Sequence, residues 1–433
     1  MPISIFDHKE TLMKYNEEIL EGYKLVKASN VFVNDTFAVE KVEVLRENIQ
    51  NLYENKVFPK ITCCILTFNE ERCIERCISS IHQEVDEVVV LDSGSTDRTL
   101  EIIKEKFPNV KIVSLEWQND FAYQRNYVLN HTSHDWVLFL DADEYLFERD
   151  RGKIKSVIRF ATIFEDKEFC ISPFIRNTDG HTYNDTKRIF NKRANIRYYG
   201  KVHEEPLTGD KNIPSHMIVD ITFLHDGYEL DVVQNKNKFK RNISLIEDMV
   251  IKEPNNYKWK FFLGREKYAN GNIEEFPESI DILVDVINYY FELDEPSPKY
   301  LCESLVIVCN AYLSMGYIDK LQEYLEILRS KFPNCSDIYY FDLIINLLIC
   351  KKSTYNFIQK IEKEVIGNDI GVSYINSTNS HLYSLLVLSL LGMGENKRAL
   401  EIYCKENLSE KNPELRDQLK DTFYQLKKTL GIS

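Results

Sequence analysis

Residues 136–143 read Trp-Val-Leu-Phe-Leu-Asp-Ala-Asp, an apolar run that ends in two acidic residues. An unbroken apolar run of this length is typical of a strand buried on both faces of a parallel sheet. Asp141 and Asp143 then lie at the carboxyl end of that strand, where α/β sheets bind their ligands. Two carboxylates so close together can converge on one Mg²⁺ or Mn²⁺ ion, because these cations prefer oxygen ligands and bridge phosphates. The same triplet also occurs in solvated turns, but its place after a buried strand favours the metal site.

Strand and helix patterns alternate on both sides of this run. Further strands are predicted at residues 61–66, 87–91, 110–113, 169–174, 185–190 and 197–203. A helix is predicted over 69–81, beginning on Asn69 as its cap, and another over 96–106 with Asp97 near its start. This alternation predicts an α/β domain with a mainly parallel sheet.

Polar residues follow two of the predicted strands. Thr67, Asn69 and Glu70 come after the strand at 61–66, and Asp92 and Ser93 come after the strand at 87–91. Ordinary helix caps would explain either group alone. Three polar strand ends at one edge of a sheet, with the acidic pair as the third, favour a nucleotide-binding cleft.

A predicted helix at 120–126 contains Arg125, whose guanidinium suits bidentate contact with a phosphate or a carboxylate. A lone Arg on a helix is more often part of a surface ion pair, so it counts only beside the other motifs.

Residues 200–206, Gly-Lys-Val-His-Glu-Glu-Pro, contain the candidate catalytic residues His203, Glu204 and Glu205. Transfer of a group to a hydroxyl or thiol needs a base that removes the proton. Neighbouring side chains on an extended segment point to opposite faces, so only one of the two glutamates can face the cleft. His225 is a candidate third metal ligand, although a single His is more often structural.

The composition limits which partners the protein can bind and where in the cell we expect it. The balance of 54 Lys and Arg against 68 Asp and Glu gives a net charge of −14, which argues against non-specific nucleic-acid binding. No apolar run approaches the roughly 20 residues of a membrane-spanning helix. The N-terminus lacks the pattern of a secretory signal, so the ten Cys residues predict reduced thiols and a cytoplasmic protein. Cys73 and Cys77, four residues apart, are interpreted as buried free thiols rather than metal ligands.

The 433 residues divide into three predicted regions. Residues 1–58 form a helical arm with amphipathic stretches at 10–27 and 39–53, residues 59–240 form the α/β domain, and residues 241–433 are helical. Candidate helix ends recur at Asn270-Gly271, Met315-Gly316 and Met393-Gly394. Their spacing, with Leu263-Gly264 before Tyr268, predicts an array of helical hairpins similar to tetratricopeptide repeats, whose period is about 34 residues.

Together these motifs resemble the family 2 glycosyltransferases of the GT-A fold. More closely, the chain resembles the sublancin-type peptide S-glycosyltransferases, which modify glycosylated bacteriocins. The Asp-x-Asp motif is generic to the superfamily, whereas Asp120-Phe121-Ala122 with Arg125-Asn126, and residues 201–206, are narrower signals. The resemblance is carried by residues 67–70, 91–97, 117–126, 141–143, 172–174, 181–190, 200–206 and 225–228.

The resemblance implies a donor site for UDP-glucose or another UDP-hexose over the strand ends. Its contacts would be Thr67, Asn69, Glu70, Asp92, Ser93, Asp120, Tyr123, Arg125 and Asp141. Asp141 and Asp143, with His225, would hold Mg²⁺ or Mn²⁺ on the diphosphate.

The resemblance also implies the acceptor, which would be a Cys or Ser of a ribosomal precursor peptide, and the transfer would invert the anomeric carbon. Glu204 would act as the base, with Glu205 as the fallback and His203 beside them. Members of the family form homodimers through helical parts outside the catalytic domain, and the helical array could also hold the peptide.

Three other functions fit some of these features. A transferase that builds cell-envelope polysaccharide or lipopolysaccharide core would share the catalytic domain but take a carbohydrate or lipid-linked acceptor. A helical-repeat scaffold with a decayed transferase domain would show no activity, although the intact acidic residues argue against it. A nucleotidyltransferase would release pyrophosphate rather than UDP.

Overall fold

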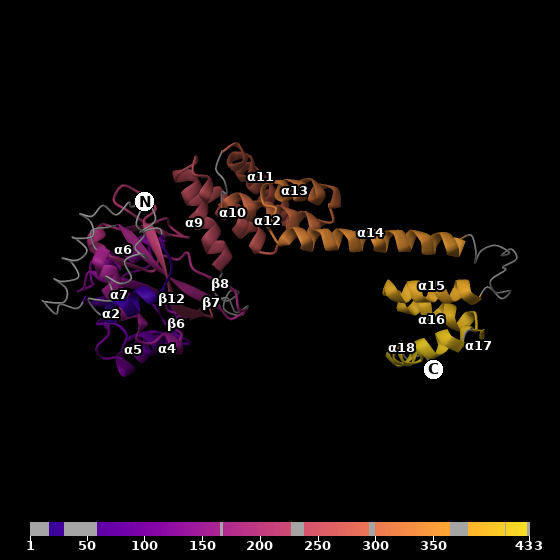
Figure 1. Ribbon diagram of the computed structural model, residues 1–433, viewed down its shortest axis with the longest axis horizontal. Coiled ribbons are helices and arrows are strands. Elements are labelled where there is room, and N and C mark those ends of the chain that lie inside the picture. The colour runs from indigo at the N-terminus through magenta and orange to yellow at the C-terminus, as the bar shows by residue number, and fades with distance from the viewer. Residues whose placement is uncertain are drawn as a thin grey trace. The chain divides into compact units, whose positions relative to one another are not determined.

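A computed structural model describes residues 17–29, 59–164, 168–226, 238–293, 299–363, 380–411 and 413–430. The chain forms two compact units that divide between Tyr289 and Tyr290. In Figure 1 the sheet and its flanking helices run from indigo to magenta, and the helices of the second unit are orange and yellow. The predicted boundaries near residues 58 and 240 stay predictions, and the predicted helix at 39–53 lies outside the described residues.

The first unit is built on a mixed ten-stranded sheet, counted over the described residues. Its main path is β1 (Val26–Ser29), β12 (Ser215–His225), β7 (Phe169–Asn177), β9 (Ile189–Asn191), β5 (Trp136–Asp141), β2 (Ile61–Thr67), β3 (Glu87–Asp92) and β4 (Lys111–Ser114). β6 (Glu144–Leu146) pairs with β12, and β8 (Thr182–Tyr183) pairs with β7. β5, β2, β3 and β4 run parallel, whereas β9 is antiparallel to both β5 and β7. The α/β sheet predicted from the apolar runs is confirmed.

The register of the parallel strands brings the predicted polar ends together. Asp141 pairs with Leu66, and the next residue of β2, Thr67, pairs with Asp92. These residues therefore lie side by side at the carboxyl edge of β5, β2 and β3, as the sequence predicted.

Helices cover both faces of the sheet because alternate strand residues point to opposite sides. Cys63 and Ile65 of β2 pack in a core with α4 (Ile74–Ile81), α5 (Thr99–Lys106) and α7 (Lys153–Ala161). Cys64, between them, packs in a second core with α6 (Phe121–Leu129). That second core also contains Tyr198 of the small two-stranded sheet of β10 (Arg197–Tyr199) and β11 (Glu205–Leu207).

The predicted cap of the first helix is wrong. α4 begins at Ile74 rather than Asn69, and its cap residue, Cys73, makes no side-chain capping bond. Asn69 instead has a φ of 55°, and its Oδ1 accepts from the backbone N–H of Thr96 at 2.8 Å and of Asp97 at 3.3 Å. The amide side chain therefore joins two βα loops across the sheet edge instead of capping its own helix.

The remaining described chain is an array of helices, as predicted. They are α9 (Lys238–Lys252), α10 (Tyr257–Ala269), α11 (Phe276–Glu292), α12 (Lys299–Met315), α13 (Ile318–Lys331), α14 (Asp337–Ile361), α15 (Ser380–Gly392), α16 (Asn396–Lys405), α17 (Leu408–Lys411) and α18 (Pro413–Leu430). Gly271, Gly316 and Gly394 follow helix ends with positive φ, which is the conformation that favours glycine there. Over the described residues, no helix has the length and apolarity needed to cross a membrane.

The cysteines are free thiols, most of them buried, as the sequence predicted. Cys350 and Cys404 are exposed, Cys302 and Cys335 are intermediate, and the buried ones are Cys63, Cys64, Cys73, Cys77, Cys170 and Cys309. Burial raises the pKa of Cys309 to about 12 and that of Cys302 to about 11, which suppresses the reactive thiolate.

We therefore expect an alkylating reagent to modify Cys350 and Cys404 first in the native protein. Mass spectrometry of proteolytic peptides would locate the modified residues, and denaturation should make all ten react. Rapid native labelling of Cys63 or Cys77 would contradict the packing of the sheet core described here.

Candidate functional site

The centre of the candidate site is a buried cluster of opposite charges around Asp141. Arg125 Nη2 on α6 donates to Asp141 Oδ1 at 2.8 Å, and Arg188 Nη2 donates to Asp141 Oδ2 at 2.8 Å. Burial raises the pKa of Asp141, but Arg188 and Arg125 outweigh it and hold that pKa far below its usual range. Asp141 is therefore a fixed anion at the sheet edge, and Arg125 belongs to the site rather than to a surface ion pair.

Glu144 is a further member of this cluster. Its side chain is 1% exposed, its Oε1 accepts from Arg188 at 2.6 Å, and its Oε2 accepts from the Asp141 backbone N–H at 3.1 Å. Burial raises the pKa of Glu144 to about 7, against the opposing charge of Arg188. Glu144 and Arg188 thus support the turn that carries the two acidic residues.

Glu204 and Glu205 point in opposite directions, as expected for an extended segment. Glu204 Oε1 accepts from Arg125 Nε at 2.6 Å, and its side chain is 11% exposed. Glu205 instead pairs with Lys258 of α10. Arg125 therefore joins Glu204 to Asp141, whereas Glu205 faces the helical part of the unit.

Gly200 allows the Glu204 segment, residues 199–205, to pass close to α10. Its φ is 107°, and a Cβ there would lie 2.6 Å from Cη2 of the buried Trp259.

We expect Gly200→Ala to lower the free energy of unfolding by roughly 2–4 kcal/mol, because left-handed strain and overpacking act together. Denaturant unfolding would measure the loss. The control is Gly180→Ala, where φ is also positive but nothing lies within 4 Å of the Cβ, so only the strain of roughly 1–2 kcal/mol should remain. Equal losses in the two variants would contradict the close contact.

Asp143 and His225 form the best candidate for a metal-binding pair. Asp143 Oδ2 lies 3.6 Å from His225 Nε2, and His225 Nδ1 lies 3.0 Å from Asn177 Oδ1, which orients the ring. Burial lowers the pKa of His225, but the Asp143 carboxylate beside it outweighs burial and raises that pKa. No three His, Cys, Asp or Glu side chains of the described residues form a complete metal site. A carboxylate and an imidazole nevertheless fit a cation that takes its other ligands from phosphate and water.

Asp141 fits less well as a metal ligand, because each of its two oxygens already accepts from a guanidinium group. Its predicted role as a ligand stays a prediction, and its place beside Arg125 suits a contact with the donor equally well.

The chain after His225 is held by a clamp at Asp226. Arg72 donates to both oxygens of this buried carboxylate, at 2.9 and 3.1 Å, and Arg76 also pairs with it. The Asp226 backbone N–H donates to Asp143 O at 3.3 Å. The clamp thus keeps the end of β12 beside the acidic turn.

The predicted nucleotide contacts at the ends of β2 and β3 lie close together, and several of their polar groups already bond to each other or to neighbouring loop residues. The Asp92 carboxylate accepts from the backbone N–H of Gly94 at 3.0 Å and of Ser95 at 3.2 Å, which closes the loop after β3. The Ser93 backbone N–H donates to Thr67 O at 3.0 Å. These bonds shape the loops that would surround a nucleotide.

Of the other three predicted contacts, Glu70 lies in the turn before α4, and Asp120 and Tyr123 lie at the start of α6. Glu70 Oε2 accepts from the Cys73 thiol, with 3.2 Å between the heavy atoms. Asp120 caps α6, since its Oδ1 accepts from the Tyr123 backbone N–H at 2.8 Å. The Tyr123 side chain is half exposed, so its ring is available for contact with a ligand.

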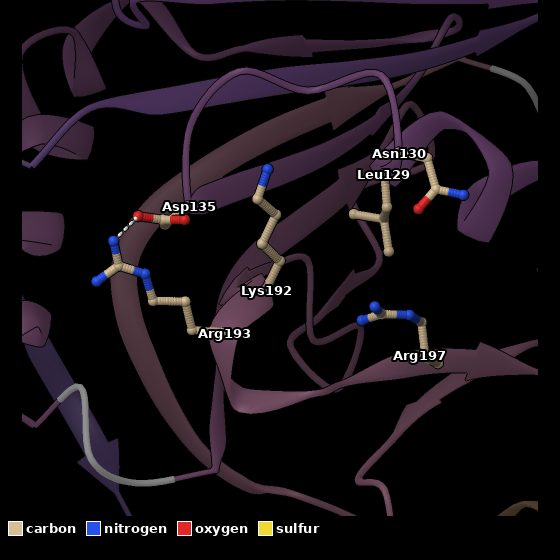
Figure 2. Close-up of a pocket in the computed structure, with 6 residues that line it drawn as sticks. All are labelled: Leu129, Asn130, Asp135, Lys192, Arg193 and Arg197. Atoms are coloured by element: carbon tan, nitrogen blue, oxygen red, sulfur yellow. Dashed lines mark ion pairs between the residues drawn. The ribbon is translucent and has the colours of Figure 1, made fainter.

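The described pocket shown in Figure 2 is not this site. It has a volume of about 320 Å³ and is lined by Leu129, Asn130, Asp135, Lys192, Arg193 and Arg197. Asp135, which pairs with Arg193 at 2.7 Å, precedes β5, so the pocket lies at the opposite end of that strand from Asp141.

Comparison with known proteins identifies related chains. The model of the family described as Glycosyl transferase family 2 matches residues 62–219. The SPbeta prophage-derived glycosyltransferase SunS of Bacillus subtilis (strain 168) is 32% identical over 419 residues, which cover 95% of this chain and 97% of that protein. The TPR repeat-containing protein Synpcc7942_0270 of Synechococcus elongatus is 30% identical over 151 residues, covering 34% of this chain and 35% of that protein.

Solved structures are more distant. S. aureus TarS is 16% identical with a TM-score of 0.35, covering 61% of this chain and 54% of that chain. A structure of TarS 1–349 in complex with UDP has the same identity and TM-score, covering 63% of this chain and 91% of that chain.

Proposed function

The chain belongs to the family 2 glycosyltransferases, and on that premise we propose that it moves a hexose from a UDP-sugar to a Cys or Ser side chain of a ribosomal peptide. The observation that carries this proposal is the similarity to SunS, which covers the helical part of the chain as well as the catalytic domain. With the parallel strands of the mixed sheet and the family match, this similarity confirms the predicted GT-A fold and the sublancin-type resemblance. A transferase of envelope polysaccharide would share the catalytic domain but take a carbohydrate or lipid-linked acceptor.

The proposed donor site lies over the ends of β2, β3 and β5. Thr67 and Asp92 are paired neighbours there, and Asp141 lies on the adjacent strand. Arg125 and Tyr123 on α6 would flank the sugar diphosphate. UDP-glucose is the donor that the resemblance favours among the UDP-hexoses.

Asp143 and His225 would hold Mg²⁺ or Mn²⁺, with Asp141 close by. When bound, such a cation offsets negative charge on the departing diphosphate. Arg125 and Arg188 keep Asp141 ionised, and the Asp226 clamp keeps His225 beside Asp143. The chain therefore keeps the negative charge of the site fixed before the donor binds.

Glu204 is the proposed base. Its carboxylate would accept the proton of the acceptor Cys or Ser as the sulfur or oxygen attacks the anomeric carbon, with inversion and release of UDP. Burial and the bond from Arg125 fix its direction, which suits a group that must meet one proton at one position. We also propose a homodimer through the helical parts of the chain.

The experiment that tests this function is a panel of donors and acceptors with UDP release as the readout. We expect acceptor-stimulated UDP release with a basic peptide that carries one Cys, less with its Ser counterpart and none above background with its Ala counterpart. Stimulation by a lipid-linked or envelope glycan, but by none of the peptides, would favour the envelope transferase instead. Pyrophosphate release from a nucleoside triphosphate would favour a nucleotidyltransferase.

A further inference from the structure

The segment that carries Glu204 is held along its length by the α9–α10 hairpin, which lies beyond the matched residues 62–219. Four residues of the Glu204 segment bond to this hairpin. The pairs are Tyr199 with Glu253, Lys201 with Asp248 at 2.6 Å, His203 with Glu266 at 3.1 Å and Glu205 with Lys258. Glu204, between two of these residues, faces Arg125 instead. Tyr199 and Glu205 pair across the β10–β11 hairpin, so residues 200–204 form its loop. The helical contacts of His203 and Glu205, on either side of Glu204, therefore help to set which way Glu204 points.

His203 is the least relaxed member of the segment. Its φ is 49°, in the left-handed region, which is uncommon for residues with a Cβ and is stabilised by their surroundings. Its ring stacks on Phe262 of α10, with centroids 4.2 Å apart and planes at 19°. The residue immediately before Glu204 therefore depends on α10 for its conformation.

His203 has two polar neighbours on α10, namely Arg265, whose Nη2 lies 3.4 Å from His203 Nε2, and the closer Glu266. The Glu266 side chain is buried on α10, and its Oε1 lies 3.1 Å from His203 Nε2, while its Oε2 accepts from Asn242 of α9 at 3.4 Å. Burial raises the pKa of Glu266, but the bond to His203 and the charge of Arg265 outweigh burial, so that pKa is lowered. Glu266 is therefore an ionised group in a fixed place.

We propose that Glu266 is a positioning residue for the transfer, because it holds His203 in its left-handed conformation and thereby aims Glu204 at the acceptor. This inference rests on the proposed function. It makes the α9–α10 hairpin part of the active site, through the loop that carries Glu204.

The test compares Glu266→Ala with Lys267→Ala in the full chain. Lys267 is the adjacent charged residue on α10, but its partners, Glu247 and Glu278, lie on other helices and not on the Glu204 segment. We expect Glu266→Ala to lower kcat for peptide glycosylation about 10- to 100-fold, since a small misplacement of a reacting group has that effect. Hydrolysis of the UDP-sugar without peptide, and the KM for the donor, should stay unchanged. Lys267→Ala should leave both reactions unchanged.

A double-mutant cycle with His203→Gly separates positioning from general damage. Glycine adopts positive φ without strain, so the conformation at residue 203 would no longer depend on Glu266. The double variant should therefore be no worse than the poorer single variant, whereas additive losses would overturn the proposal. Equal losses of glycosylation and donor hydrolysis in Glu266→Ala would also overturn it.

A second variant keeps the test valid if Glu266→Ala does not fold. Glu266→Asp retains the charge but withdraws it from His203, and it should show the same selective loss of glycosylation; full activity would contradict the role. Wild-type protein that hydrolyses the donor but glycosylates no peptide would refute the proposed function itself, and the positioning role with it.

Discussion

Asp143→Ala should lower glycosyl transfer by about three orders of magnitude or more, which corresponds to about 4 kcal/mol of transition-state stabilisation. Asp143 supplies the proposed carboxylate ligand, and its partner His225 would be left to hold the cation alone. The thermal unfolding midpoint should change little, because the side chain lies at the sheet edge outside the apolar cores. Transfer kinetics and calorimetry of the same preparations would test both expectations.

Metal binding gives this prediction a readout that does not depend on turnover. Titration of Mn²⁺ in the presence of UDP, followed by electron paramagnetic resonance, should show weaker binding in Asp143→Ala than in wild type. The matched control is Asp179→Ala, which removes a carboxylate that accepts from the His181 backbone N–H in an exposed turn. Unchanged Mn²⁺ binding together with unchanged transfer would contradict the role of Asp143.

Glu204→Gln should reduce kcat for a Ser acceptor by about 10²- to 10⁴-fold, the usual effect of losing a general base. The amide has nearly the same shape and can still accept from Arg125, so the fold should be kept. A Cys acceptor should lose much less, because a thiol has a pKa of about 8.5 and supplies some thiolate without a base. Rates with paired Cys and Ser peptides would measure the difference.

The pH dependence sharpens this test. With Glu204→Gln, the rate on the Cys peptide should rise with pH towards about 8.5 as the thiolate fraction increases, while the Ser peptide should stay slow. Equal losses on both acceptors would exclude Glu204 as the base. A larger loss in Glu205→Gln than in Glu204→Gln would transfer that role to Glu205.

The central parallel strands β3 and β5 could be predicted because each is an apolar run that ends in an acidic residue. β12 was not predicted, because polar residues interrupt its apolar ones. The run from Trp136 to Leu140 is buried along its whole length, as its composition requires. The prediction that Asn69 caps the first helix was wrong, because an Asn before a helical pattern is usually a helix cap. Its side chain instead bonds to a loop 27 residues further along the chain, and no local pattern indicates that contact.

Some residues of the candidate site could not be found from the sequence. Arg188 and Glu144 reach Asp141 only because β9 and the turn after β5 meet at the sheet edge. Arg188 carried one usable signal, a charged residue directly before the apolar pair Ile189-Phe190 of a predicted strand. Glu266 carried none, since a single acidic residue on a helix is ordinarily solvated.

The most direct test of the central claim is the intact mass of a basic, helix-forming peptide with one free Cys after incubation with the protein, UDP-glucose and Mg²⁺ or Mn²⁺. The account predicts a gain of one or more hexosyl units, which fragmentation places on the Cys and which is absent with Asp143→Ala. An unchanged peptide mass while UDP is released would contradict the peptide acceptor, and no UDP release from any UDP-hexose would contradict the donor as well.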